Sequence, residues 1–177
     1  MSERSLLPRH LNVPSIPTTG IDQHIVAKPT ELLQIADYLG LLELRSLTAD
    51  ITAARSGSTV ALTGRVRAEL AQRCVVTLVP VVQSVDEAFD RRLVRVKTRR
   101  DFPKPHPEVG VDEADPPDLY AGDAIDLGAI VLEQLALAID PYPRAPGAEL
   151  PPPASADAEH ADSPFAVLKS LGQSGSS

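Results

Sequence analysis

The sequence predicts an α+β protein: a mainly antiparallel β-sheet, open or barrel-like, flanked by two helices, with a Pro-rich acidic loop and a flexible C-terminal tail. Two observations predict this class. Apolar and polar residues alternate over long stretches, and two other stretches have helical spacing of apolar residues. The 177 residues are 43% hydrophobic, enough for one core. We expect an extended N-terminal arm over residues 1–20, a single α+β domain over residues 21–146, and a disordered linker with a short helical motif over residues 147–177.

The first elements are expected to be an extended segment, a strand and a helix. Three prolines within residues 1–20 favour an extended arm or an edge strand. Residues 24–27 form a short apolar run that is typical of a strand. Thr30 is the expected N-cap of the helix that follows, and Gly40 is its expected end.

Three strands are expected next. Residues 47–53 and 60–70 each alternate apolar and polar side chains, and residues 55–58 between them have the composition of a turn. Residues 74–82 are apolar on both faces, which predicts a third strand covered on both sides, with its pairing ended or bulged at Pro80.

A fourth strand is expected to start at Val85. Its alternation changes phase before Val94, which predicts a β-bulge near Arg92. Residues 101–118 are rich in prolines mixed with acidic residues and contain few apolar ones. This segment is therefore predicted to be a long loop.

The clearest helix covers residues 127–139, with Asp126 as its N-cap and Pro141 beyond its end. Its apolar residues extend almost all the way round, so we expect it to be buried. A linker rich in Pro, Ala and acidic residues follows, and then a short amphipathic stretch. The apolar face of that stretch is expected either to dock on a partner protein or to fold back on the sheet. The residues of this candidate docking motif are Phe165, Leu168 and Leu171.

Charge is distributed unevenly along the chain. The formal net charge is −7, but residues 65–104 sum to +5 and residues 105–177 to −11. Alternate residues of a strand share a face, and their spacing of about 6.5–7 Å is close to that of nucleic-acid phosphates. The basic segment therefore predicts either contact with RNA phosphates or a strand edge protected from aggregation. The candidate RNA-binding residues are Arg65, Arg67, Arg91, Arg95, Lys97, Arg99 and Arg100.

Several chemistries are not expected. Aromatic residues make up 3% of the chain, which argues against recognition of RNA by stacked rings. Cys74, the single cysteine, shares strand parity with Val76 and Leu78, so a buried structural thiol is favoured over a nucleophile. The histidines are scattered, and phosphate-loop and nucleophile-elbow motifs are absent. We expect no catalytic residues, metal or cofactor, and a hydrolase that uses Cys74 is the remaining enzymatic alternative. No signal peptide or membrane span is expected, so the protein is predicted to be cytoplasmic with no membrane partner.

Four segments together carry a family resemblance. They are residues 64–80 (GRVRAELAQRCVVTLVP), 85–90 (VDEAFD), 121–148 (AGDAIDLGAIVLEQLALAIDPYPRAPGA) and 163–171 (SPFAVLKSL). The chain resembles the YceD-like family, the large ribosomal RNA subunit accumulation proteins of bacteria and plastids. It is most similar to the alphaproteobacterial form.

The resemblance implies a non-enzymatic ribosome-biogenesis factor for the synthesis, processing or stability of large-subunit (23S) rRNA. Many relatives have Cys-x-x-Cys where this chain has Cys74 and Thr77, so the resemblance carries over no metal or redox role. The expected partners are precursor large-subunit rRNA or a ribonucleoprotein particle, and a ribosome-assembly or RNA-processing protein. The expected mechanism is weak contact with RNA phosphates together with protein docking, and the alternative is a protein–protein adaptor with no direct RNA contact.

Overall fold

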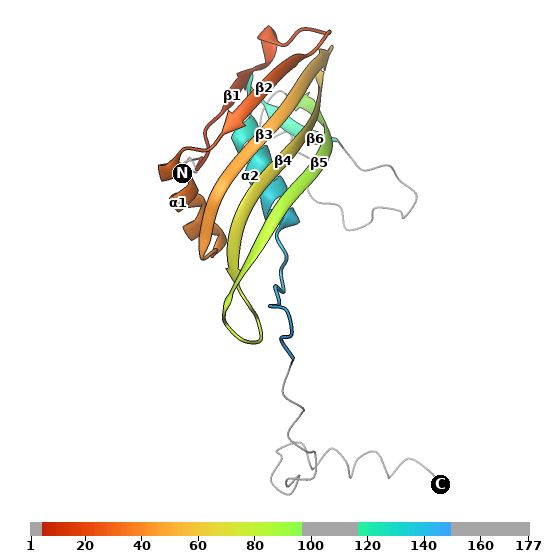
Figure 1. Ribbon diagram of the computed structural model, residues 1–177. Helices are drawn as coiled ribbons and strands as arrows, with labels where there is room; N and C mark the ends of the chain where they lie inside the picture. Colours follow the sequence, from red (N-terminus) through yellow and green to blue (C-terminus); the bar gives the residue numbers. More distant parts are fainter. Residues whose placement is uncertain (1–4, 97–116, 150–177) are drawn as a thin grey trace, which may run out of the picture. The chain divides into compact units, whose positions relative to one another are not determined.

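The computed structural model describes residues 5–96 and 117–149. Its main sheet has five strands in the order β2-β3-β4-β5-β6 (Figure 1). The first four are antiparallel neighbours, and β6 joins β5 in parallel. Their bounds are β2 Ile21–Val26, β3 Glu43–Ser56, β4 Thr59–Arg73, β5 Pro80–Val96 and β6 Asp118–Ala121. A mostly antiparallel sheet with two helices confirms the α+β class. The barrel-like form is wrong, because the sheet is open.

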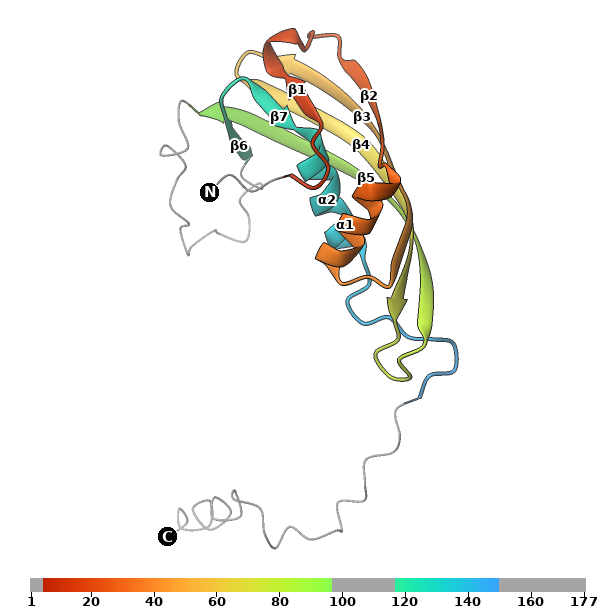
Figure 2. The same ribbon diagram turned by 90° about the vertical axis from the view of Figure 1, so that its left-hand side faces the viewer.

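Two helices and a second, two-stranded sheet cover one face of the main sheet. Figure 2 shows both helices on the same, concave side. The short 3-10 helix η1 links the first strand of the small sheet to the main sheet. The bounds are α1 Pro29–Leu39, α2 Leu127–Ala138, β1 His10–Asn12, β7 Ala124–Asp126 and η1 Val13–Ser15. The described part of the chain is thus a two-layer structure.

The core lies between these two layers. Alternate residues of β3 and β4, such as Leu47, Ile51 and Leu62, point into it and are almost completely buried. Ile35 of α1 and Leu135 of α2 pack against them from the other layer. Among the described residues no polar or charged side chain is buried. The strands predicted over residues 47–53 and 60–70 are therefore confirmed, together with their inward and outward faces.

The N-terminal segment is part of this core. Leu7, Leu11 and Ile16 are buried, and β1 pairs antiparallel with β7. The backbone of Leu7 approaches Gly128 of α2 so closely that a Cβ on Gly128 would lie 1.5 Å from the Leu7 carbonyl oxygen. Residues 5–20 comprise the short strand β1, the 3-10 helix η1 and a turn, and their buried side chains belong to the same core as the sheet and helices. The predicted domain boundary at residue 20 stays a prediction.

The predicted third strand is wrong. β4 runs on to Arg73, residues 74–79 form the β4–β5 turn, and β5 begins at Pro80, where a missing N–H is tolerated. The bulge expected near Arg92 is also absent, because the β4–β5 register is continuous from the Arg73 pair to the pair of Thr59 with Val94.

Three of the four helix ends bear on the capping residues that the sequence predicts. Lys28, not Thr30, is the N-cap of α1, and Gly40 ends the helix in the left-handed conformation as predicted. The Asp126 side chain caps α2 by accepting a hydrogen bond from the Gly128 N–H. However, α2 is not buried all the way round, because Leu137 is 73% exposed. The predicted loop over 101–118 lies almost wholly, and the C-terminal motif wholly, outside the described residues.

Candidate functional site

Arg65 and Arg67 lie on the outer face of β4, where each binds carboxylates of neighbouring strands. Arg65 Nη1 lies 2.9 Å from Asp86 Oδ1, and Arg67 Nη1 lies 2.8 Å from Asp50 Oδ2. His24 Nδ1 lies 2.6 Å from Asp50 Oδ1, and its hydrogen bond, followed by that from Arg67, lowers the pKa of Asp50. Positive and negative side chains therefore alternate across this face.

Arg91 and Arg95 lie on the opposite, helix-covered face of β5. The Arg91 side chain is only 17% exposed and lies 3.1 Å from Asp118 Oδ2 and 3.0 Å from Glu133 Oε1. Its hydrogen bond to Glu133 raises the pKa of the guanidinium. Arg95 Nη2 lies 2.6 Å from Asp123 Oδ1. These pairs connect β5 to β6, to α2 and to the turn that precedes β7.

Arg91 and Arg95 thus share one face of β5, as the alternation of a strand predicts, but the four described candidate arginines do not form one continuous basic surface. They lie on two faces of the sheet, and their carboxylate partners are 17 to 42 positions away in the sequence. Lys97, Arg99 and Arg100 lie outside the described residues. RNA contact by any member of the set stays a prediction.

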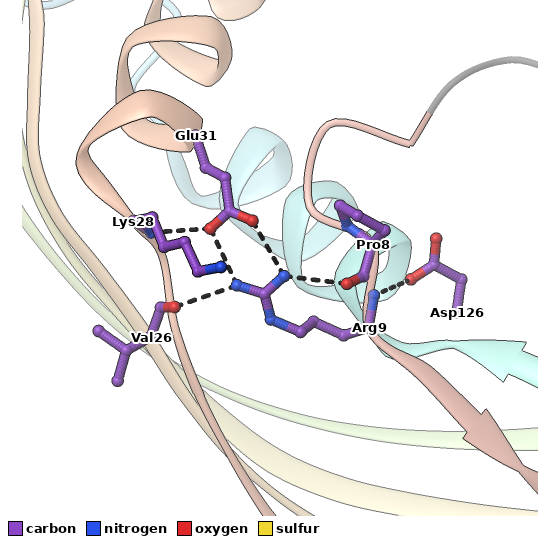
Figure 3. Close-up of polar contacts among 6 residues, drawn as sticks. All are labelled: Pro8, Arg9, Val26, Lys28, Glu31 and Asp126. Atoms are coloured by element: carbon purple, nitrogen blue, oxygen red, sulfur yellow. Dashed lines mark hydrogen bonds and ion pairs between the residues drawn. The ribbon is translucent and has the colours of Figure 1, made fainter.

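A further arginine, Arg9, joins three parts of the domain (Figure 3). Its guanidinium donates to both carboxylate oxygens of Glu31, at 3.0 and 2.9 Å, and to the carbonyl oxygens of Pro8 and Val26. Its backbone N–H donates to the Asp126 side chain. The hydrogen bond from Arg9 lowers the pKa of Glu31, so the pair is charged near neutral pH. The sequence analysis missed this cluster, because nothing in the spacing of its members brings them together.

Cys74 is buried, as predicted, but it lies at the start of a turn rather than in a strand. Its Sγ accepts hydrogen bonds from the backbone N–H groups of Val76, Thr77 and Ala145, at 3.3–3.4 Å. The hydroxyl and N–H of Thr77, followed by the N–H of Ala145, lower the pKa of Cys74 to about 6. The thiol thus connects the β4–β5 turn to the segment that follows α2. Within residues 5–96 and 117–149, no three His, Cys, Asp or Glu side chains are close enough to hold a metal ion.

The exposed large apolar side chains gather at the end of the domain that contains the β4–β5 turn. The turn lies beside the chain that leaves α2 (Figures 1 and 2), and Val75 N–H donates to Pro143 O at 2.9 Å. Leu42 lies at the same end, because its N–H donates to Ala71 O and Ala71 pairs with Val82. We call this set the tip surface. Its residues are Leu42, Val75, Leu78, Val79, Val82, Leu137 and Tyr142.

The tip surface was not predicted from the sequence, because residues 74–82 have the apolar composition of a buried strand. One signal was available: Pro80, inside the apolar run, weakens the assignment to a central strand. Outside the tip surface, Val26, Leu33 and Tyr38 are the large hydrophobic side chains that are exposed in the described residues. Most of the exposed large apolar side chains of the described residues therefore lie at one end of the domain.

These features define a class of protein. Exposed large apolar side chains gathered at one end of a two-layer α+β domain are typical of a surface that contacts another macromolecule. The comparison with family models gives the particular family. Residues 62–172 match the model described as large ribosomal RNA subunit accumulation protein YceD, which is more than half of the chain. The chain belongs to the YceD family.

This membership confirms the resemblance and implies a role in the accumulation of large-subunit ribosomal RNA. The alphaproteobacterial form stays a prediction. The chain has no match among curated proteins or solved structures. Neither described helix is long and apolar enough to cross a membrane.

Proposed function

We propose that the protein is a non-enzymatic adaptor that supports the accumulation of 23S rRNA by holding a ribosome-assembly or RNA-processing protein. The observation that carries this proposal is the tip surface, which holds seven exposed large apolar side chains, compared with three elsewhere in the described residues. Exposed apolar patches of this kind mark protein–protein contacts.

The paired arginines favour the adaptor over direct RNA binding. A guanidinium gains affinity for RNA by neutralising a phosphate and releasing its counterions. Arg65, Arg67, Arg91 and Arg95 are each held by a carboxylate at 2.6–3.1 Å. Replacing that carboxylate by an RNA phosphate adds little to the free energy of binding, because one ion pair is broken for each one that forms. RNA contact through Lys97, Arg99 and Arg100 remains the alternative, since the sequence places these three charges together.

A deletion strain tests the proposal. Loss of the protein should lower large-subunit rRNA relative to small-subunit rRNA, and an unchanged ratio would contradict the adaptor and the RNA-binding alternative together. A chain with Lys97→Glu, Arg99→Glu and Arg100→Glu should restore the ratio if the protein is an adaptor. Arg95 is left unchanged in this variant, because its reversal would also break the pair with Asp123.

The same variant separates the two mechanisms. Retention of RNA in a pull-down should persist for the adaptor, whose contact with RNA is indirect, and should collapse if these three residues bind phosphates. A matched control reverses Arg45, an exposed residue on β3 whose side chain pairs with Glu43 on the same strand. Collapse of both RNA retention and the rRNA ratio with the triple variant, but not with the control, would overturn the adaptor.

A further inference from the structure

We propose that the tip surface binds an acidic amphipathic segment of a partner protein, whose apolar side chains cover the exposed hydrophobic residues and whose carboxylates pair with Arg73 and Arg144. This inference rests on the proposed function. It adds which surface holds the partner protein and which side chains that partner presents.

Two arginines at this end of the domain can pair with an acidic partner, and they outnumber the one exposed carboxylate beside Tyr142, that of Asp140, which accepts a hydrogen bond from the Tyr142 N–H at 2.8 Å. Arg73 ends β4, and Arg144 lies between Pro143 and Ala145, which are hydrogen-bonded to the β4–β5 turn. Both arginines are exposed, and within the described ranges no carboxylate lies within ion-pair distance of either. They differ in this from the four described candidate RNA-binding arginines, Arg65, Arg67, Arg91 and Arg95, which are each already paired. Free arginines beside apolar side chains are a common composition of protein interfaces.

The tip surface is held rigidly by two segments that are far apart in the sequence. Gln83 donates to Ala138 O at 3.1 Å and accepts from Asp140 N–H at 3.2 Å. Gln72 donates to Asp140 O at 3.0 Å. Together with the N–H groups that converge on Cys74 Sγ, these bonds fix the turn before any partner arrives. A surface that is already ordered loses less conformational entropy on binding.

Leu78 is the most informative residue of the turn. Its φ is +63°, a left-handed conformation in which glycine or asparagine is far less strained than a branched apolar residue. Its side chain is also 62% exposed, so the strain is not offset by burial within the described domain. A strained and exposed leucine is understandable if a partner covers its side chain.

The composition of the surface favours a protein over RNA and over a second copy of this chain. Six of its seven apolar side chains are aliphatic, with Tyr142 as the aromatic one, whereas unpaired bases bind by stacking on rings. A symmetric contact between two copies would gather Arg73 and Arg144 of both copies in one interface. Repulsion between these like charges disfavours that pairing.

Photocrosslinking in cells tests the proposal with the full-length chain. Benzoylphenylalanine replaces Tyr142 in one strain and Tyr38, on α1, in the control strain. The two tyrosines are matched, being 72% and 73% exposed. We expect a light-dependent adduct from position 142 and not from position 38, and we expect the crosslinked partner peptide to combine Asp or Glu with large apolar residues. Arg73→Glu with Arg144→Glu should reduce this adduct about tenfold.

A second variant separates binding from folding. Leu78→Gly should reduce the adduct at position 142 about tenfold by removing a central side chain. Its thermal midpoint should equal or exceed that of the parent chain, because glycine adopts the positive φ without strain. The control is Leu33→Ala, which truncates an even more exposed leucine on α1, at 73% against 62% for Leu78, and should leave the adduct unchanged.

Several outcomes would overturn the proposal. The first is the absence of any adduct at position 142. The second is an adduct with RNA, with a second copy of the chain, or with residues 163–171 of the same chain. The third is an adduct with a partner protein that persists after the charges of Arg73 and Arg144 are reversed. If Leu78→Gly fully restores the rRNA ratio in the deletion strain, the tip surface does not hold the partner, and only the family's role in rRNA accumulation stands. If the deletion itself leaves that ratio unchanged, the proposed function fails whatever the crosslinking shows.

Discussion

Replacing Gly128 by alanine adds a methyl group where the backbone of Leu7 already lies. The new Cβ would be 1.5 Å from the Leu7 carbonyl oxygen, whereas real Cβ atoms essentially never come within 3.0 Å of another heavy atom. The N-terminal segment or the first turn of α2 must therefore shift by at least about 1.5 Å. Since Leu7 is completely buried, this shift displaces it from the core.

The expected loss of stability follows from the contacts around Gly128. Full exposure of a leucine side chain costs about 1.5–3 kcal/mol. The hydrogen bonds from Leu127 N–H to Arg9 O and from Arg9 N–H to Asp126 Oδ1 are lost with it, at about 1 kcal/mol each. The higher helix propensity of alanine returns about 1 kcal/mol. We expect Gly128→Ala to lower the free energy of unfolding by about 2.5–4 kcal/mol.

Urea denaturation followed by circular dichroism measures this change. The control is Ala129→Gly at the neighbouring, exposed position of α2, which should cost only about 1 kcal/mol. In the Gly128→Ala background, Leu7→Ala should cost less than in the parent chain, because the Leu7 contacts are already lost. A Gly128→Ala chain as stable as the parent would refute the close approach of Leu7 to α2.

Replacing Glu31 by glutamine should lower the free energy of unfolding by about 1–2 kcal/mol, and the half-exposed Glu43→Gln by less than about 0.5 kcal/mol, both measured by chemical denaturation. Because the hydrogen bond from Arg9 lowers the pKa of Glu31, the stabilisation by this pair is complete above the ordinary carboxyl pKa and is lost as the pH falls through the lowered value. The difference between Glu31→Gln and the parent should therefore shrink in acid, and a constant difference would contradict this account. Replacing Thr77 by valine should raise the pKa of Cys74 from about 6, as measured by the ultraviolet absorbance of the thiolate, because it removes the hydroxyl hydrogen bond. Thr77→Ser should keep the low value, and an unchanged titration with valine would show that the hydroxyl has no effect.

Local sequence patterns were sufficient to predict the strands that have one face in the core and the other in solvent. In β3 and β4 every second residue faces the core, so the alternation over 47–53 and 60–70 reports the fold directly. The caps at Asp126 and Gly40 depend on neighbouring residues only, and they too could be predicted. The start of α1 was missed by two positions, because proline at the first helical position competes with Thr30 as a start signal.

The candidate site could not be predicted in the same way, because it depends on contacts between distant residues. A charge sum over residues 65–104 counts Arg67 as unpaired, yet Asp50 on β3 neutralises it from 17 positions away. A continuous apolar run has no periodicity, so residues 74–82 were not distinguished from a buried strand. The burial of Leu7 depends on a contact with α2 that no local pattern encodes.

The joining of the N-terminal segment to α2 also determines when the domain can fold during its synthesis. The hydrogen bond between Arg9 and Asp126 connects residues 117 positions apart. Until β7 and α2 have left the ribosomal exit tunnel, β1 has no strand to pair with and Leu7 lacks the α2 backbone beside it, so part of its apolar surface stays exposed. The N-terminal segment can therefore reach its native position only after residues 124–138 have been synthesised.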